Sequence, residues 1–375
     1  LTRPLGGLLF SHFGDKFGRK QSFSLSISLM AVSTLLMSLT PNYEQWGLVA
    51  TFTFVFLRLL QGISIGAEIP GALTFVSEHV PKQKGAACAV ILLCLNGGIF
   101  LGDLVHLLLS SFLDPALFDY YGWRIAFFMG GFFALISFYM RQSLSETDGF
   151  LANKRKHRVP FLVLMKRHKT GVVKAICLAG AAASVTSIFL LYFNSYAQSV
   201  LNLSASQAGT LSLHQLLVFL TFSAFASYWS DRVGCVIILK SSAAYLMIGP
   251  FLVFKIINGA DFVVMEVVLL INAACIGVYS GAMPCYLSEL FPTSVRYSGI
   301  ALGYNLGFAL FGGLSPLLSS FLIRAYHWPE APALMIALSG LLALLSFSIK
   351  EETIMKTEHT DHLNCAHSTL KCNPL

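Results

Sequence analysis

Ionisable side chains inside long apolar runs are the residues of this chain with the clearest chemical potential. Arg58 and Glu68 share one such run with Gln61 between them, and Asp103 and His106 lie three residues apart in another. Charged groups there cost about 2.5–3.5 kcal/mol on membrane insertion scales, which makes them candidates for function. A carboxylate or imidazole in such a place can take up and release a proton. We therefore predict proton coupling at Glu68, Asp103 and His106, with Arg58 as a charge that shifts the pKa of a nearby carboxylate, and solute binding at Gln61. The alternative is hydrogen bonding between helices.

Two further groups of polar and aromatic residues could bind a small solute. Tyr192, Asn194 and Tyr196 lie in the run LLYFNSYAQ, and Tyr304 and Asn305 lie in a later apolar run. Tyrosine rings can hold a quaternary ammonium group through cation–π contacts, and their hydroxyls can hydrogen-bond a carboxylate. We predict that these five residues contribute to substrate binding. The alternative for tyrosines near the end of a span is a place in the interfacial aromatic belt.

The composition places the chain among polytopic membrane proteins. Of its 375 residues, 55% are hydrophobic and 11% are charged, against roughly 25% charged residues in soluble domains. A helix needs about 20 apolar residues to cross a bilayer, and runs that are apolar on all faces favour bundled helices over a barrel. The sequence therefore predicts an all-α membrane fold with ten complete spans, at residues 23–39, 47–69, 86–112, 123–141, 172–198, 208–229, 236–257, 262–284, 297–323 and 332–349.

An eleventh apolar run, residues 1–13, is long enough for only half a span. The chain opens at Leu1, with neither a start methionine nor the charge pattern of a signal peptide. We therefore expect a sequence truncated at its N-terminus, with the first one and a half helices missing. Supplying them would give twelve spans with both termini on the same side of the membrane.

The basic residues between the apolar runs predict the orientation, because Lys and Arg collect in cytoplasmic loops. Three basic residues lie within 16–20 and seven within 154–169, whereas segments 40–46 and 113–122 contain none. We expect the basic loops, and the C-terminal tail from Lys350 onward, to face the cytoplasm. The net charge of +7 reflects this topology. It does not indicate nucleic-acid binding, for which the chain lacks a folded basic domain.

The segment FGDKFGRKQ, residues 13–21, places glycines and charges between two apolar runs. Gly18 permits a tight turn, Asp15 can accept hydrogen bonds from helix N-terminal amides, and Arg19 offers a forked donor to a carboxylate. Such contacts can hold helix ends in one arrangement and release them in another. The pattern therefore indicates conformational gating by Asp15, Gly18 and Arg19. The alternative is a cluster that only anchors the topology.

An internal repeat indicates two related halves. The segment DKFG at 15–18 returns as DRVG at 231–234, and SEHVP at 77–81 returns as SELFP at 288–292. Related halves around a central site are common in transporters. We expect an incomplete first helical half at 1–141, a cytoplasmic basic linker at 142–171, a second helical half at 172–349 and a disordered cytoplasmic tail at 350–375.

The chain resembles the major facilitator superfamily, in particular the metabolite:proton symporter branch that includes proline/betaine, shikimate, citrate and ketoglutarate transporters. Four segments in order carry the resemblance: RPLGGLLFSHFGDKFGRK at 3–20, RLLQGISIGAEIPGA at 58–72, GWRIAFFMGG at 122–131, and SELFPTSVRYSGIALGYNLGFALFGGLSPLL at 288–318. The resemblance implies two pseudo-symmetric six-helix halves. It also implies a monomeric secondary transporter of the bacterial inner membrane that takes up a small polar metabolite together with protons by alternating access.

The same resemblance implies roles for individual residues. Arg58 occupies the arginine of the RxxQG motif, which is linked to proton coupling in the superfamily, and Glu68 matches the glutamate of the branch's GGE pattern. Asp231 and Arg232 would gate the second half. Cys235 stands where that copy of the motif should carry a basic residue. We therefore expect weaker gating contacts in the second half than in the first.

Motifs for other chemistry are missing from the sequence. No phosphate-binding loop, nucleophile elbow or H-E-x-x-H motif occurs, and the eight cysteines form no C-x-x-C pair. Residues 359–372 are rich in His and Cys, but a short tract without a folded frame is weak support for a metal, so we predict no metal and no cofactor. The alternatives to a transporter are a non-transporting receptor, an inactive truncated product and, less favoured, a polytopic membrane enzyme.

Overall fold

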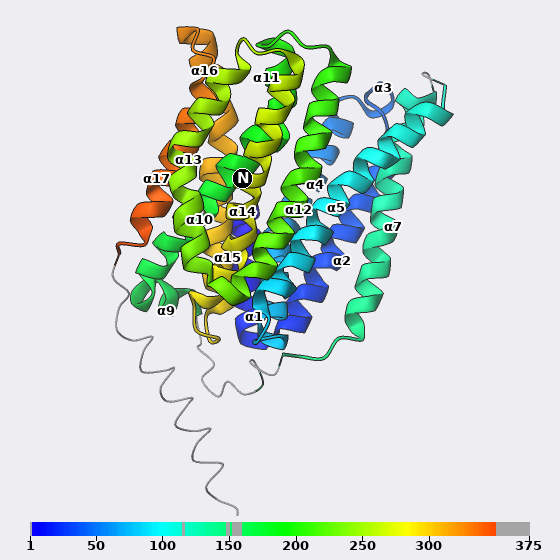
Figure 1. The fold of residues 1–375 in the computed structure, drawn as a ribbon. Helices are drawn as coiled ribbons and strands as arrows, with labels where there is room; N and C mark the ends of the chain where they lie inside the picture. The colour runs from blue at the N-terminus through cyan, green and yellow to red at the C-terminus, as the bar shows by residue number, and fades with distance from the viewer. Residues whose placement is uncertain (1, 115–116, 148–150, 152–159, 350–375) are drawn as a thin grey trace, which may run out of the picture.

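The computed structural model describes residues 2–114, 117–147, 151 and 160–349. Within these ranges every regular element is a helix, which confirms the all-α prediction (Figure 1). Nine of the described helices are long and apolar enough to cross a membrane, and Ala331–Ser346 is a shorter apolar helix. Together they match the ten expected spans. The half-span expected at 1–13 is a helix that continues to Phe17, and the expected tail at 350–375 lies outside the described residues.

The helices form two groups along the chain. The first half contains α1 (Arg3–Phe17), α2 (Arg19–Ser38), α3 (Tyr43–Trp46), α4 (Leu48–His79), α5 (Lys84–Phe112), η1 (Phe118–Gly122) and α7 (Trp123–Gln142). A short helix, α9 (Pro160–Arg167), lies within the expected linker. The second half contains α10 (Lys169–Val185), η2 (Thr186–Tyr192), α11 (Phe193–Ser199), α12 (Ala205–Val233), α13 (Cys235–Ile257), α14 (Phe262–Glu289), α15 (Arg296–Gly307), η3 (Phe308–Gly312), α16 (Gly313–Tyr326) and α17 (Ala331–Ser346).

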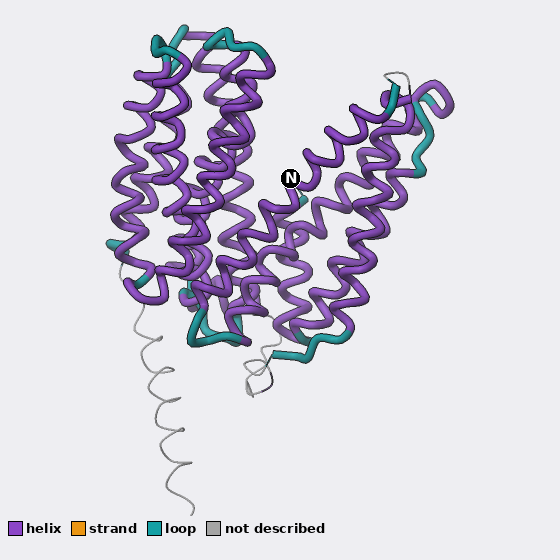
Figure 2. Tube along the Cα trace, turned by 45° about the vertical axis from the view of Figure 1, so that its right-hand side comes forward, coloured by secondary structure: helices purple, strands orange, loops and turns teal. Residues whose placement is uncertain are grey.

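Figure 2 shows that the two groups of helices converge at one end and diverge at the other. We call the converging end, where residues 16–20 and Lys84 lie, the basic end. Across the junction α1 and α4 pack against α15, and α5 packs against α12. Among these contacts, the repeat relates the α1–α15 pair to the α5–α12 pair.

Both copies of the repeated motif turn the chain in the same unusual way. Gly18 joins α1 to α2 with φ 135°, and Gly234 joins α12 to α13 with φ 92°. Side chains other than glycine rarely adopt these backbone angles. The glycine of DKFG and its counterpart in DRVG are therefore explained by the turn itself.

Replacing Gly234 by alanine should destabilise the protein through backbone strain alone, because a Cβ there would meet nothing within 4 Å. We expect a cost of about 1–3 kcal/mol, seen as a lower Tm in detergent micelles. Gly209→Ala is the matched control, since it lies inside α12 and also has open space around it. That variant should be neutral or slightly more stable. Equal Tm values for the two variants would contradict the requirement for glycine at the turn.

Candidate functional site

Asp15 of the first half binds the start of a helix in the second half. Its Oδ2 accepts hydrogen bonds from the backbone N–H of Ser298 at 2.9 Å and from the Ser298 hydroxyl at 2.6 Å. Ser298 lies in the first turn of α15, where backbone N–H groups have no acceptor within the helix. A carboxylate there also interacts favourably with the helix dipole. Asp15 therefore caps α15 from the opposite half.

Arg19 reinforces this contact from the far side of the Gly18 turn. Its Nη1 forms an ion pair with Asp15 Oδ1 at 2.8 Å and donates to the Gly14 carbonyl at 2.9 Å. Its Nη2 donates to the Thr293 carbonyl at 2.7 Å, in the segment before α15. Both charged side chains are buried, and Arg19 therefore joins the two halves as well as neutralising Asp15.

Glu78, at the end of α4, joins the same group of charges. One of its oxygens lies 3.4 Å from Arg19 Nη2 and 3.3 Å from Arg296 Nη1 of the second half. The other oxygen accepts from the Thr147 hydroxyl at 2.7 Å. We call Asp15, Arg19, Glu78, Arg296 and Ser298 the Asp15 cluster. It places two carboxylates between two arginines at the basic end.

Asp231 makes the reciprocal contact from the second half to the first. Its two carboxylate oxygens accept from the backbone N–H groups of Gly85 at 2.7 Å and Ala86 at 2.9 Å, both in the first turn of α5. The Ser227 hydroxyl donates to the Gly85 carbonyl at 2.9 Å. We call Asp231, Ser227, Gly85 and Ala86 the Asp231 cluster. Each half thus caps one helix of the other.

The two clusters differ in their charged neighbours. Arg232 contacts Tyr228 of its own helix, with Nη2 3.4 Å from the hydroxyl. Cys235 occupies the position that corresponds to Arg19, is buried, and has its Sγ 3.0 Å from Cys285 Sγ. Glu289, the counterpart of Glu78, is half-exposed and lies 3.6 Å from Lys84 Nζ. Gating by Asp231 and Arg232 stays a prediction, but the two side chains point to different partners.

Arg58 and Gln61 lie together within the first half. Arg58 is exposed, stacks over the rings of Phe127 and Phe54 at 4.9 and 5.4 Å, and donates to Gln61 Oε1 at 3.2 Å. The Gln61 amide donates to the Thr34 hydroxyl at 2.7 Å. A proton-coupling role for Arg58 stays a prediction.

Glu68 has a different arginine as its partner. Arg141 at the end of α7 forms a two-pronged contact with the Glu68 carboxylate, at 3.1 and 2.8 Å, and Ser26 donates to the same carboxylate at 2.7 Å. Glu68 lies ten residues from Arg58 on α4, which is about 15 Å along a helix. The structure therefore separates the two residues that the sequence placed in one run.

The first tyrosine group is divided between several contacts. Tyr196 is buried, and its hydroxyl donates to Asn258 Oδ1 at 3.1 Å and to the Pro329 carbonyl at 2.9 Å. Tyr192 accepts from the Ser320 hydroxyl at 3.1 Å. Asn194 accepts from Gln198 at 2.5 Å on the surface of α11. Tyr196 thus connects the segment between α13 and α14 to the segment between α16 and α17.

The second group lies where the halves meet. The Asn305 amide donates to the Gly66 carbonyl of α4 at 2.7 Å and to the Ala301 carbonyl at 2.9 Å. Tyr304 stacks on Phe308 with ring centroids 4.3 Å apart, and the guanidinium of Arg3 lies 5.9 Å from its ring. Both predicted substrate residues therefore face the first half.

Two predicted proton-coupling residues, Asp103 and His106, lie on α5, but their side chains fall outside the described part of the structure. A titratable pair that the sequence prediction left out of the site joins α12 to α14. His214 Nδ1 lies 2.6 Å from Glu266 Oε1, and both side chains are partly exposed. Within the described residues no group of three or more His, Cys, Asp or Glu side chains is placed to hold a metal ion.

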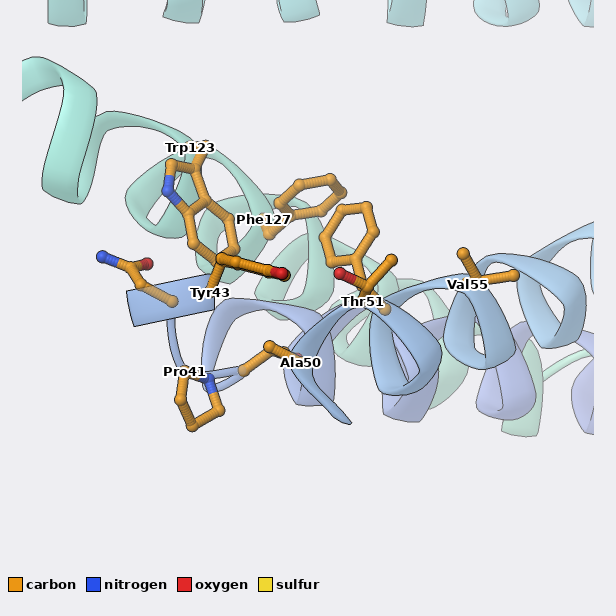
Figure 3. A pocket seen from close by; sticks show the side chains of 10 residues that line it. Pro41, Tyr43, Ala50, Thr51, Val55, Trp123 and Phe127 are labelled. Atoms are coloured by element: carbon orange, nitrogen blue, oxygen red, sulfur yellow. The ribbon is translucent and has the colours of Figure 1, made fainter. Parts of the chain in front are cut away.

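A cavity of about 350 Å³ lies beside α3, at the end opposite the basic end (Figure 1), and Figure 3 shows it from close by. Aromatic side chains dominate its wall, including Tyr43, Phe54, Trp123 and Phe127. All the lining residues come from α3, α4, α7 and the segment between α2 and α3. A site used from both sides of a membrane needs contacts from both halves, so this cavity is a weaker candidate than the junction.

The family model of the Major Facilitator Superfamily matches residues 3–302 and 175–365, which together cover nearly the whole chain. The chain belongs to the Major Facilitator Superfamily. It is therefore a multi-pass membrane transporter and not an enzyme, in agreement with the helical fold and the nine apolar helices.

Several curated proteins are similar over most of the chain. A putative proline/betaine transporter of Staphylococcus aureus is 27% identical over 352 residues, covering 92% of this chain and 75% of the relative. The glycine betaine/proline/ectoine/pipecolic acid transporter OusA of Dickeya dadantii is 29% identical over 371 residues, covering 95% and 74%. The citrate-proton symporter of Salmonella typhi is 31% identical over 353 residues, covering 92% and 80%.

Solved structures of the superfamily share the fold. The proton:xylose symporter XylE bound to 6-bromo-6-deoxy-D-glucose matches with a TM-score of 0.76 at 19% identity, over 92% of this chain and 82% of XylE. The transporter FucP in the outward conformation matches with a TM-score of 0.68 at 13% identity, over 91% and 85%.

Sequence reasoning missed several residues of these contacts. Glu78 belongs to the repeated segment SEHVP, so its counterpart in SELFP was a usable signal. Arg3 is the first residue of the segment RPLGG, and Arg141 ends an apolar run. Arg296 and Ser298 lie in the segment 288–318 that carries the resemblance, but nothing local pointed to their partners, which lie more than two hundred residues away.

Replacing Glu78 by glutamine should destabilise the protein far more than the same change at its repeat counterpart. Removing one partner of a buried ion pair costs up to about 3–5 kcal/mol, and Glu78 faces two arginines. Glu289→Gln is the matched control, because an exposed pair contributes only about 0–1 kcal/mol. Thermal unfolding in micelles should show a large fall in Tm for Glu78→Gln alone. An equal fall in Tm for the two variants would contradict the claim that Glu78 forms buried ion pairs and Glu289 only an exposed one.

Proposed function

We propose that this protein is a secondary active transporter that takes up a small polar metabolite together with protons by alternating access. The basic end would face the cytoplasm of a bacterium, and the two halves would rock about a site between them. The observation that carries the proposal is the reciprocal capping at one end, where Asp15 binds α15 and Asp231 binds α5.

The strength of these contacts suits a switch. Hydrogen bonds to charged groups contribute about 1.5–3 kcal/mol each, so the two bonds of either aspartate are worth roughly 3–6 kcal/mol. An equilibrium between two conformations moves from 99:1 to 1:99 with a change of about 5.5 kcal/mol. The two quantities are of the same order. Binding of a solute and a proton can therefore shift the protein between closed and open forms of the basic end.

Proton coupling requires a group that changes its protonation state as access alternates. The proposal assigns this role to Glu68, Asp103 and His106, and adds the His214–Glu266 pair. Arg58 stays charged, and its part in proton coupling is electrostatic. Support comes from the cost of such groups in an apolar helix and from the similarity to a citrate-proton symporter. The proline/betaine and citrate transporters among the relatives support a small polar substrate.

The direct test is proton movement in proteoliposomes that enclose a pH-sensitive dye. The panel is betaine, proline, succinate, ketoglutarate, citrate and shikimate, added one at a time. The proposal expects a pH change triggered by one solute or one chemical class. Solute accumulation without any pH change, in correctly oriented protein, would contradict proton coupling.

Asp15→Asn and Asp231→Asn should each lower concentrative uptake at least about tenfold, while the protein still inserts into the membrane. Asparagine keeps the shape of the side chain, but the loss of charge weakens the bonds to the helix amides. Asp261→Asn is the control, because Asp261 is exposed and its side chain forms no cap bond at α14. Wild-type uptake in both cluster variants would contradict the gating role.

Arg58→Ala should abolish the solute-triggered pH change and accumulation against a gradient. The physical reason is the loss of the positive charge that donates a hydrogen bond to Gln61. Uptake of radiolabelled solute and the dye signal are measured on the same vesicles. Accumulation at the wild-type level would remove Arg58 from the mechanism.

A further inference from the structure

Arg3 lies where the two halves meet. α1 begins at this residue, and its start is at mid-height between the two groups of helices (Figures 1 and 2). The guanidinium carbon lies 5.9 Å from the centre of the Tyr304 ring and 5.5 Å from that of Phe308. A charged side chain of the first half therefore rests on two aromatic rings of the second.

Two hydrogen-bond donors of Arg3 lack an acceptor. Within the described part of the chain, Nε and Nη2 are buried and have no hydrogen-bond partner. These two nitrogens lie on the same edge of the guanidinium, and this edge binds a carboxylate through two parallel hydrogen bonds. A buried charged donor without an acceptor is costly, especially at membrane depth. The two unpaired donors therefore match a planar anion with two oxygens.

The surroundings hold this donor edge in place. Tyr304 and Phe308 stack on each other with ring planes at 26°, and cation–π contact fixes the guanidinium against them. Phe308 begins the π-helix η3, and π-helical segments are frequent at functional sites. Behind Arg3, α4 approaches so closely that a Cβ on Gly66 would lie 2.1 Å from the Arg3 carbonyl oxygen. The side chain is therefore oriented before any ligand binds.

We propose that Arg3 binds the carboxylate group of the transported solute through Nε and Nη2, and that the substrate class is small carboxylates. This inference rests on the proposed transport function. A carboxylate on that edge would be held by α1 and enclosed by the rings of α15 and η3. Because the solute would touch both halves, its binding energy would differ between their two arrangements, which is the condition for coupling binding to movement.

Solutes that differ only in the carboxylate test the substrate class. Glycine betaine is compared with choline, and proline with prolinamide, in uptake by proteoliposomes and in the Tm shift that each solute causes in micelles. The proposal expects uptake and a Tm increase only from carboxylates. Equal uptake of choline and betaine would overturn the carboxylate assignment while leaving the transport function in place.

Arg3→Lys keeps the positive charge but removes the two-pronged donor edge. For the transported carboxylate we expect KM to rise about 10- to 100-fold, the factor that corresponds to losing a hydrogen bond to a charged group. Arg324→Lys is the matched control, because Arg324 is exposed and lies near the C-terminal end of α16. This substitution should leave KM unchanged. A wild-type KM in Arg3→Lys would overturn the proposal.

The Tm measurement keeps the two hypotheses separable. A Tm increase with carboxylates that disappears in Arg3→Gln, without transport of any solute, would support the site and overturn the proposed function. Transport of carboxylates with an unchanged Tm response in Arg3→Gln would overturn the site and support the function. No Tm response in the wild-type protein to any carboxylate of the panel would also overturn the site.

Discussion

The first-turn amides of α5 and α15 are the groups on which the arrangement of the two halves depends. These amides have no acceptor within their own helices, and in each case an aspartate of the other half supplies one. Burying Asp15 would be unfavourable without the ion pair to Arg19 and the bonds to Ser298. The buried charges at the basic end are thus stable only because the two halves supply partners for each other there, and hydration of the same groups can replace these partners when the halves part.

The rest of the fold is consistent with a movement between two such halves. Tyr196 fastens connecting segments within the second half, and Arg141 with Glu68 fastens α4, α7 and α2 within the first. Contacts of this kind keep each half rigid. The contacts between halves are concentrated at α1, α4 and α15 and at α5 and α12. Rigid halves joined along two repeat-related pairs of helices suit rocking better than local unfolding.

The sequence was sufficient for the spans and for the repeat, because composition and local motifs carry that information. It placed gating chemistry at Asp15 and Arg19, and the structure brings both to the junction, although their role stays a prediction. It missed Arg3, Glu78 and Arg296. Helices that are apolar on nearly all sides carry no amphipathic stripe to show which face meets the other half. For the same reason the sequence could not distinguish the buried Tyr196 from an interfacial tyrosine.

Hydrogen–deuterium exchange at the first-turn amides of α5 and α15 tests the central claim most directly, since their protection comes from the aspartates. In Asp231→Asn the account predicts faster exchange at Gly85 and Ala86, and also at Ser298, because the two clusters open together when the halves part. Faster exchange at Gly85 and Ala86 with an unchanged rate at Ser298 would contradict it. The clusters would then be independent local caps, and not the two parts of one closure.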